Sequence, residues 1–329
     1  MLDYTNIRIV HLEISTRCNA ACPDCPRNFR GVDVINSYPL TDMRLPQAQK
    51  IFTESFLKQL LRIYINGNYG DFVTAQDGLA IVEYFKSVNP ALRIEISTNA
   101  SAKPHIWAQL GKLKTKVYFR LDGLKDTHHL YRQNTDFDLI INNAKEFIAA
   151  GGIATWAMIP FKHNRHQIEQ CRKMSEELGF YEFLLQDAGR DTMPVFDKNK
   201  NFTHAIGDYQ GSIEFEQLYK EYKTIYDPAT ILKSINVVDK TVKCKAKKYS
   251  EIYISATGDV YPCCWLGFYP QTTPTDIRNF QLAPLISKNN SLEYGIEESI
   301  KWFNEVEQTW NKQSVGAGKL YTCNQYCGK

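Results

Sequence analysis

Strand-like and helix-like segments alternate over the first 187 residues, and this alternation constrains the fold more than any other feature of the chain. Runs rich in β-branched and aromatic residues predict six strands, at 7–14, 61–66, 92–98, 117–123, 154–161 and 181–187. The segments between them have helical periodicity. Such an alternation is typical of repeated βα units around a parallel sheet. We therefore predict an α/β fold, a partial (β/α)6 TIM-like barrel over residues 1–190, with any site at the carboxyl ends of its strands.

The chain changes character after Asp187. Residues 191–240 are polar and have no clear period, which predicts a connecting linker. From Cys244 the stretch "YSEIYISATGDVYPCCW" predicts a β-hairpin, with "ATGD" at its turn. A helix is expected over 291–312, followed by the tail "LYTCNQYCGK". We predict a small C-terminal domain over residues 241–329.

Composition makes the cysteines informative. The 329 residues contain nine cysteines, carry a net charge of +3 and include no run near the roughly 18 apolar residues of a membrane span. The N-terminus has neither the basic start nor the apolar centre of a signal peptide. We expect a cytoplasmic protein that makes no use of a membrane. Because disulfides are rare there, the cysteines favour metal or redox roles. The short basic patch "KCKAKK" is weak support for nucleic-acid binding.

Three of the cysteines, Cys18, Cys22 and Cys25, follow the first strand at the spacing C-x3-C-x2-C. Structural zinc sites are closed by four ligands, and no further cysteine or histidine follows before the next helix. A [4Fe–4S] cluster tolerates three protein ligands, with one iron left for a small molecule. The loop also leaves its strand on the side where substrates bind in βα barrels. The pattern indicates a cluster with one open iron.

A second group of cysteines lies near the C-terminus. Cys244 and Cys263 flank the hairpin at the spacing C-x13-G-x4-C, and Cys323 and Cys327 form a C-x3-C pair. Four sulfur ligands of this kind hold either zinc or an iron–sulfur cluster, and spacing alone does not decide between them. Cys264 is an alternative to Cys263, which satisfies the glycine spacing.

The three-cysteine loop after the first strand of a βα array resembles that of the radical S-adenosylmethionine (SAM) superfamily, over about residues 5–190. This resemblance implies that the open iron binds the amino and carboxylate groups of SAM. It also implies that one electron from the cluster cleaves the sulfonium and yields a 5′-deoxyadenosyl radical, which abstracts a substrate hydrogen. The reductant would be a protein such as flavodoxin or ferredoxin.

Further positions match the family pattern. "NGNYGD" resembles the glycine-rich stretch that contacts the SAM amino group, and "EISTNAS" resembles the third-strand exit with its polar SAM contacts. "RLDGLKDTHHLYR" resembles the fourth-strand exit and places Asp122 and Arg132 at the barrel mouth. The SAM-binding residues implied by the resemblance are Asn66, Gly67, Asn68, Gly70, Ser97 and Asn99. The chain departs from the pattern in having Asp24 where an aromatic residue is common and in lacking a glutamate at the end of the glycine-rich stretch.

The C-terminal hairpin spacing resembles the auxiliary-cluster modules of this superfamily, called SPASM when long and twitch when truncated. The resemblance implies a second [4Fe–4S] cluster of the twitch type, held by Cys244, Cys263, Cys323 and Cys327. Arg190, after the last predicted strand, is a candidate proton acceptor or substrate clamp, and Asp122 is the second candidate catalytic residue.

An auxiliary cluster with four protein ligands suits an electron acceptor. The sequence therefore favours an oxidative, dehydrogenase-like radical reaction on a small molecule or a peptide. A peptide maturase would be expected to have an N-terminal leader-binding region, and the first strand here begins within ten residues, which favours a small molecule or a separately delivered peptide. Two alternatives stay open: a maturase of a ribosomal peptide or protein side chain, and a non-catalytic iron–sulfur electron relay.

Overall fold

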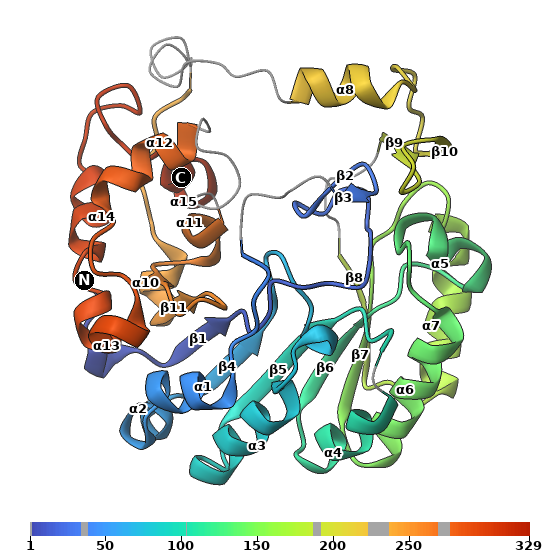
Figure 1. The fold of residues 1–329 in the computed structure, drawn as a ribbon, viewed down its shortest axis with the longest axis horizontal. Coiled ribbons are helices and arrows are strands. Elements are labelled where there is room, and N and C mark those ends of the chain that lie inside the picture. Colours follow the sequence, from blue (N-terminus) through green and yellow to red (C-terminus); the bar gives the residue numbers. More distant parts are fainter. Residues whose placement is uncertain (1, 34–38, 103, 187–191, 223–236, 269–276) are drawn as a thin grey trace.

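The computed structural model describes residues 2–33, 39–102, 104–186, 192–222, 237–268 and 277–329 (Figure 1). Its centre is an eight-stranded sheet with the order β12-β11-β1-β4-β5-β6-β7-β8. Neighbouring strands are parallel throughout, except that β12 runs antiparallel to β11. The six strands predicted from the sequence are β1 (Ile9–Leu12), β4 (Arg62–Ile65), β5 (Arg93–Thr98), β6 (Lys116–Arg120), β7 (Ile153–Met158) and β8 (Glu182–Leu185). The predicted α/β barrel fold is confirmed.

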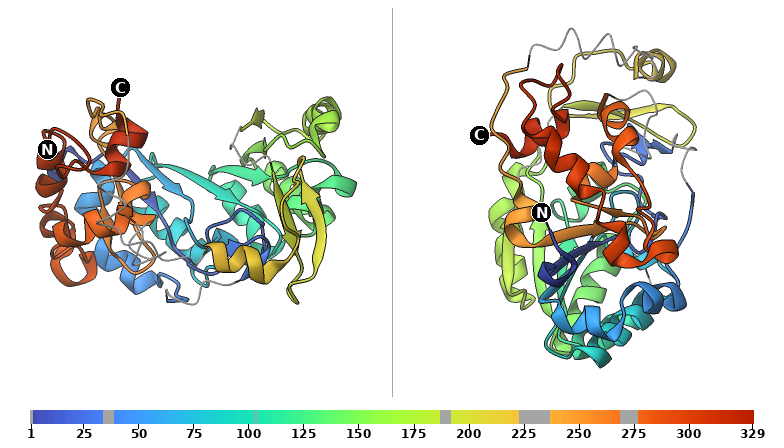
Figure 2. Two further views of the ribbon diagram at one scale, coloured as in Figure 1. Left: turned by 90° about the horizontal axis from the view of Figure 1, so that it is seen from above. Right: turned by 90° about the vertical axis from the view of Figure 1, so that its left-hand side faces the viewer.

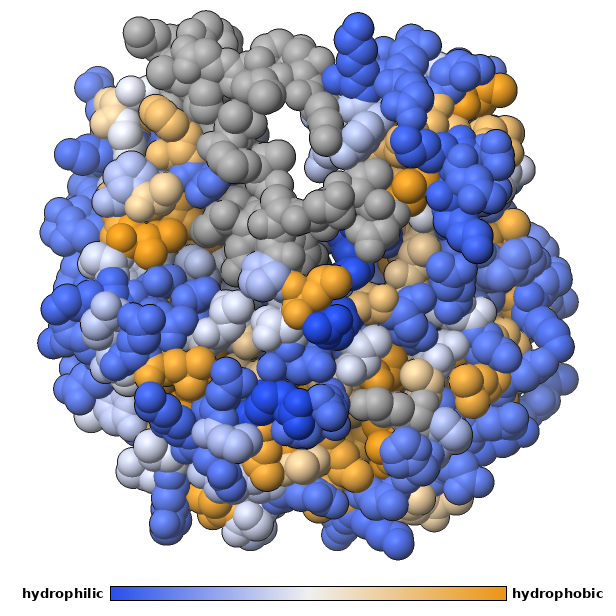
Figure 3. All heavy atoms as spheres, viewed as in Figure 1, coloured by the Kyte–Doolittle hydropathy of each residue, from blue (hydrophilic) through white to orange (hydrophobic). Residues whose placement is uncertain are grey.

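Helices cover one face of this sheet (Figures 1 and 2). They are α1 (Leu45–Ile51), α2 (Glu54–Gln59), α3 (Gly78–Val88), α4 (Trp107–Lys112), α5 (Lys125–Tyr131), α6 (Phe137–Ala149) and α7 (Ile168–Glu177). Alternate strand residues such as Ile63, Ile94 and Trp156 face these helices and are fully or almost fully buried. The exposed sides of the helices are largely hydrophilic, with scattered apolar residues (Figure 3).

The residues between these apolar positions form the other face of the sheet, which we call the polar face. Its polar members in the strands include His11, Arg62, Tyr64, Glu95, Lys116, Tyr118, Arg120 and Glu182, and also Arg93, Ser97, Thr155 and Glu251. Most of them are only partly buried, although the apolar neighbours in β1 and β4–β7 are almost inaccessible to solvent. In the edge strand β8 the apolar neighbours are themselves partly or largely exposed. A side chain that faces into a barrel and is still partly accessible indicates that the barrel interior is not filled by protein.

The predicted C-terminal hairpin joins the main sheet. Its strands are β11 (Glu251–Ile254) and β12 (Val260–Tyr261), and β11 pairs in parallel with β1 from Ile9–Glu251 to Leu12–Ile254. Around it lie α10 (Lys245–Tyr249), α11 (Cys264–Phe268), α12 (Ile277–Leu282), α13 (Ser291–Ser299), α14 (Phe303–Thr309) and α15 (Tyr321–Cys327) (Figure 1, orange to red). The sequence predicts one helix over 291–312. The structure has two, and Gly295 within α13 has a non-helical φ of 75°.

Regular elements also occur where the sequence predicts only a linker. β9 (Met193–Phe196) and β10 (Phe202–Ile206) form an antiparallel hairpin, and α8 (Phe215–Tyr222) follows. This segment has no regular hydrophobic period because β9 is buried on both sides, whereas in β10 only Ile206 is buried. Across the described part of the chain, no helix is both long and apolar enough to span a bilayer.

Candidate functional site

The three-cysteine loop lies at the carboxyl end of β1, among apolar residues. Cys22 is buried, and Cys18 and Cys25 are half-buried. All three belong to one apolar cluster with Ala20, Tyr131, Ile159, Phe161, Met193, Val195 and Ile206. The β9–β10 hairpin therefore supplies part of the wall around this loop, a contact between segments about 170 residues apart in sequence.

Hydrogen-bond donors point at the sulfur atoms of the loop. The backbone N–H of Ala20 donates to Cys18 Sγ at 3.4 Å, and Asn99 Nδ2 donates to the same atom at 3.8 Å. Arg132 Nη1 donates to Cys22 Sγ at 3.7 Å. Donors and cations of this kind stabilise thiolates and tune the metal that they bind. Asn99 and Arg132, both expected at the site from the sequence, are thus brought to the cysteines.

The donor set fits a three-cysteine iron–sulfur cluster. Burial, with smaller contributions from Asp71 and the other two cysteines, raises the pKa of the Cys18 thiol, so cluster assembly has to displace a proton there. In the described part of the chain, no three His, Cys, Asp or Glu side chains converge closely enough to hold a metal ion as they stand. The fit therefore rests on three soft ligands in one loop, on their mutual electrostatic interaction and on the donors aimed at them.

The glycine-rich stretch packs directly against the backbone that leads into the cysteine loop. A Cβ on Gly70 would lie 1.9 Å from the carbonyl oxygen of Ser15 and 2.8 Å from that of Arg17. A Cβ on Gly67 would lie 2.2 Å from the carbonyl oxygen of Gly70. Both glycines are therefore required by close packing of the chain on itself. The backbone oxygen of Asn66 is hydrogen-bonded to His11 Nε2 at 2.7 Å.

Glu13 was not singled out in the sequence, and it holds the glycine-rich stretch. Its Oε1 accepts from the backbone N–H groups of Tyr69 at 2.8 Å and Gly70 at 3.0 Å. Its Oε2 accepts from the hydroxyl of Tyr253 in β11 at 2.5 Å. Burial raises the pKa of this carboxyl group. The glutamate missing from the end of the stretch is thus matched by a buried carboxyl group directly after β1. Glu13 continues the polar-face register of Ile9 and His11, and this could have drawn attention to it.

Asp71 was also missed, and it organises the turn after β5. Its carboxylate accepts from Thr98 Oγ1 at 2.5 Å and from the backbone N–H of Asn99 at 2.8 Å. Asn99 in turn donates from Nδ2 to Asn19 Oδ1 at 2.9 Å, which ties the turn to the cysteine loop. Ser97 has a different environment, because its Oγ accepts from Arg120 Nε at 2.8 Å.

Asp122 forms a buried ion pair with Arg132. The side chain of Asp122 is inaccessible to solvent, and its Oδ2 lies 2.6 Å from Arg132 Nε. Its Oδ1 accepts from the backbone N–H of Ile159 at 2.6 Å. Both oxygens are occupied, so these contacts favour a role in fixing the Arg132 guanidinium beside Cys22 over direct contact with substrate. Arg190, the other candidate catalytic residue, lies outside the described residues.

We expect Asp122→Asn to destabilise the protein by about 3–5 kcal/mol, because it leaves the buried Arg132 without a counter-charge. Chemical denaturation of the metal-free protein measures this change. Asp138→Asn is the matched control, since Asp138 forms an ion pair with Lys125 in which both side chains are largely exposed. Equal effects of the two substitutions would contradict the assignment of a stabilising buried pair.

The C-terminal cysteines lie near one another. Cys244 caps α10, Cys323 and Cys327 lie one turn apart on α15, and Cys263 directly precedes α11. Backbone hydrogen bonds tie the two ends together, with Lys243 N–H donating to the Cys327 oxygen at 2.8 Å. The thiols of Cys244 and Cys327 are hydrogen-bonded to each other. This hydrogen bond raises the pKa of Cys244 and lowers that of Cys327 to about 6. Cys263 interacts electrostatically with Cys244 and Cys323.

Cys264 has other neighbours. Apart from the adjacent Cys263, the charges that interact with it come from Glu251 and Tyr253 of β11. Its backbone oxygen accepts from Asn68 Nδ2 at 3.1 Å. Tyr69 stacks on Phe268 with ring centroids 5.4 Å apart and parallel planes. The glycine-rich stretch therefore contacts the C-terminal segment at α11, a few residues from Cys263.

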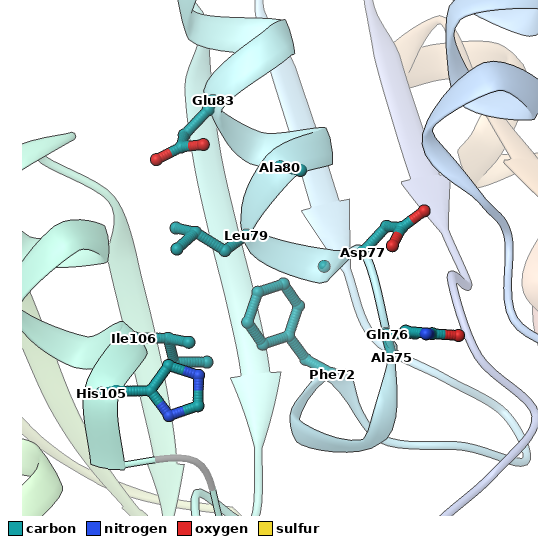
Figure 4. A pocket seen from close by; sticks show the side chains of 10 residues that line it. Phe72, Ala75, Gln76, Asp77, Leu79, Ala80, Glu83, His105 and Ile106 are labelled. Atoms are coloured by element: carbon teal, nitrogen blue, oxygen red, sulfur yellow. The ribbon is translucent and has the colours of Figure 1, made fainter.

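A groove of about 250 Å³ lies apart from these residues, on the helical side of the sheet (Figure 4). It is lined by side chains of α3, η2 (Phe72–Thr74) and η3 (Pro104–Ile106), among them Phe72, Leu79 and His105. It contains none of the site residues predicted from the sequence. Because none of the cysteines lines this groove, we do not assign the metal site to it.

Similarity to known proteins comes from structure alone. No protein-family model and no curated protein sequence matches the chain. The structure is similar to that of SuiB from Streptococcus suis bound to S-adenosylmethionine, with a TM-score of 0.58 and 16% sequence identity over 98% of this chain and 72% of SuiB. SuiB bound to its precursor peptide SuiA gives a TM-score of 0.55 and 14% identity, covering 96% of this chain and 76% of that one.

A second similar protein is anSMEcpe with bound AdoMet, with a TM-score of 0.51 and 16% identity over 95% of this chain and 85% of anSMEcpe. Both proteins are radical SAM enzymes. The chain therefore has the fold of the radical SAM enzymes, in agreement with the resemblance drawn from its first three cysteines. At these identities the likeness establishes the fold.

Proposed function

We propose that this protein is a radical SAM enzyme that oxidatively modifies a peptide or protein side chain. The observation that carries the proposal is the C-x3-C-x2-C loop at the carboxyl end of β1, with donors aimed at its sulfur atoms, in a barrel of the radical SAM fold. Cys18, Cys22 and Cys25 would hold a [4Fe–4S] cluster. Bound there with SAM, this cluster would supply the one electron that cleaves the sulfonium and yields the 5′-deoxyadenosyl radical.

The residues around the loop have supporting tasks. The backbone of 66–70, clamped by Glu13, would contact the SAM amino group, and Asn99 would contact its carboxylate or ribose. The apolar wall of Tyr131, Phe161 and Val195 would exclude water from the reactive species.

The proposal includes the C-terminal cysteines. Cys244, Cys263, Cys323 and Cys327 would hold a second [4Fe–4S] cluster, which would accept one electron from the substrate radical after that radical has lost a proton. Hydrogen abstraction, proton loss and electron transfer together make a two-electron oxidation. SuiB, which has the same fold, binds a precursor peptide. Of the two substrates that the sequence favoured, a small molecule and a separately delivered peptide, this supports the peptide.

Anaerobic reconstitution with iron and sulfide, followed by reductant and SAM, tests the proposal. We expect 5′-deoxyadenosine, measured by liquid chromatography and mass spectrometry, in an amount that depends on both reductant and SAM. Intact, reducible clusters without any 5′-deoxyadenosine would instead identify an electron-relay protein.

A further inference from the structure

Arg120 is a cation of the polar face whose hydrogen-bond partners are all neutral. It ends β6, where its Nε donates to Ser97 Oγ at 2.8 Å and its Nη1 donates to the side-chain oxygen of Gln186. Its guanidinium also lies 6.0 Å from the centre of the Tyr118 ring. No acidic side chain among the residues that the structure describes forms an ion pair with it.

The other buried or half-buried cations around this face have carboxylate partners. Arg62 Nη1 lies 3.7 Å from Glu95 Oε1, and Lys116 Nζ lies 3.0 Å from Glu182 Oε2. Arg132 is paired with Asp122 at 2.6 Å. Among the described residues, Arg120 is therefore the half-buried cation of this face that forms no ion pair. Holding a charge away from bulk water without a carboxylate in contact is costly.

Arg120 is placed where a ligand of the site could reach it. Its side chain is partly exposed, and it interacts electrostatically with Arg132 and Asp122. Arg132 donates to Cys22 Sγ, so Arg120 lies on the same side of the barrel as the cysteine loop. A guanidinium presents a planar fork of donors that matches a carboxylate in two parallel hydrogen bonds.

We propose that Arg120 binds a carboxylate of the substrate, and that the substrate is an acidic peptide segment whose aspartate or glutamate side chain provides it. This inference rests on the proposed function for the nature of the ligand. The alternative source of a carboxylate is SAM itself. By the family resemblance, however, the carboxylate of SAM has a partner in the open iron, which leaves the charge of Arg120 for the substrate.

Two capped tripeptides, acetyl-Ala-Glu-Ala-amide and acetyl-Ala-Gln-Ala-amide, test the proposal by titration calorimetry on reconstituted protein in the presence of SAM. The glutamate peptide is expected to bind about tenfold more tightly, the ratio typical of a hydrogen bond to a charged group. Arg120→Gln should remove this preference, and Arg120→Lys should keep part of it. Arg93→Gln is the matched control, because it removes the same charge from an exposed position at the start of β5.

Iron content and thermal melting show whether each variant is folded. If Arg120→Gln is misfolded, the peptide preference of Arg120→Lys is compared with that of the wild-type protein instead. Equal affinity of the wild-type protein for the two peptides would overturn the proposal, as would an equal loss of preference in Arg93→Gln. Weaker SAM binding in Arg120→Gln with the peptide preference intact would overturn it in favour of the SAM carboxylate. Succinate that binds as tightly as the glutamate peptide would support the carboxylate site but assign it to a small acid. The proposed function is tested separately: it would be contradicted if reconstituted protein with reductant and SAM formed no 5′-deoxyadenosine.

Discussion

Replacing Cys18, Cys22 and Cys25 together by alanine is expected to lower the iron content from about eight to about four atoms per chain and to abolish 5′-deoxyadenosine formation. The reason is that the three sulfur atoms are the only protein ligands proposed for the SAM-binding cluster. Iron is measured on anaerobically reconstituted protein, and the nucleoside is measured by mass spectrometry.

Cys171→Ala is the control for this triple variant. Cys171 is buried in α7 and packs in the main apolar core. Its loss should leave both readouts near the wild-type values. If the triple variant kept all its iron, the assignment of the first cluster to this loop would be wrong.

The second large effect is expected from the double variant Cys323→Ala and Cys327→Ala. Both side chains lie on one face of α15, four residues apart, so the substitution removes half of the proposed four-sulfur cage. Iron should fall from about eight to about four atoms per chain, and the remaining cluster should still change its electron paramagnetic resonance spectrum when SAM is added.

Cys264→Ala distinguishes the two adjacent cysteines. Cys264 interacts with Glu251 and Tyr253, whereas Cys263 interacts with Cys244 and Cys323. We therefore expect Cys264→Ala to keep its full iron content. A loss of about four irons in this variant would instead make Cys264 the ligand, and an unchanged iron content in the double variant would remove the auxiliary cluster from the proposal.

Much of the barrel could be predicted because each of its strands and helices is recognisable from the residues of that segment alone. Each of the six strands is a short run of apolar or alternating residues, and the helices between them have their own period, so β1 and β4–β8 could be recognised one at a time. The Cys18–Cys25 loop was equally clear, because three ligands within eight residues need no tertiary contact to be noticed.

Pairings between distant segments could not be predicted. The sequence suggests a hairpin at 251–261, but nothing in it says that β11 extends the barrel sheet beside β1. β9 and β10 were also missed, since β9 is buried on both sides and β10 is buried only at Ile206, which leaves no regular pattern in Met193–Ile206.

The sequence by itself determined the βα barrel, the two groups of cysteines and the kind of metal chemistry that they favour. Only the tertiary structure decided which polar groups are paired, because an ion pair or hydrogen bond has no signature in either local segment. Glu13 and Tyr253, for example, are hydrogen-bonded although they are 240 residues apart in sequence. For the same reason, only the placement of the strands side by side made it visible that Arg120 forms no ion pair with any described residue.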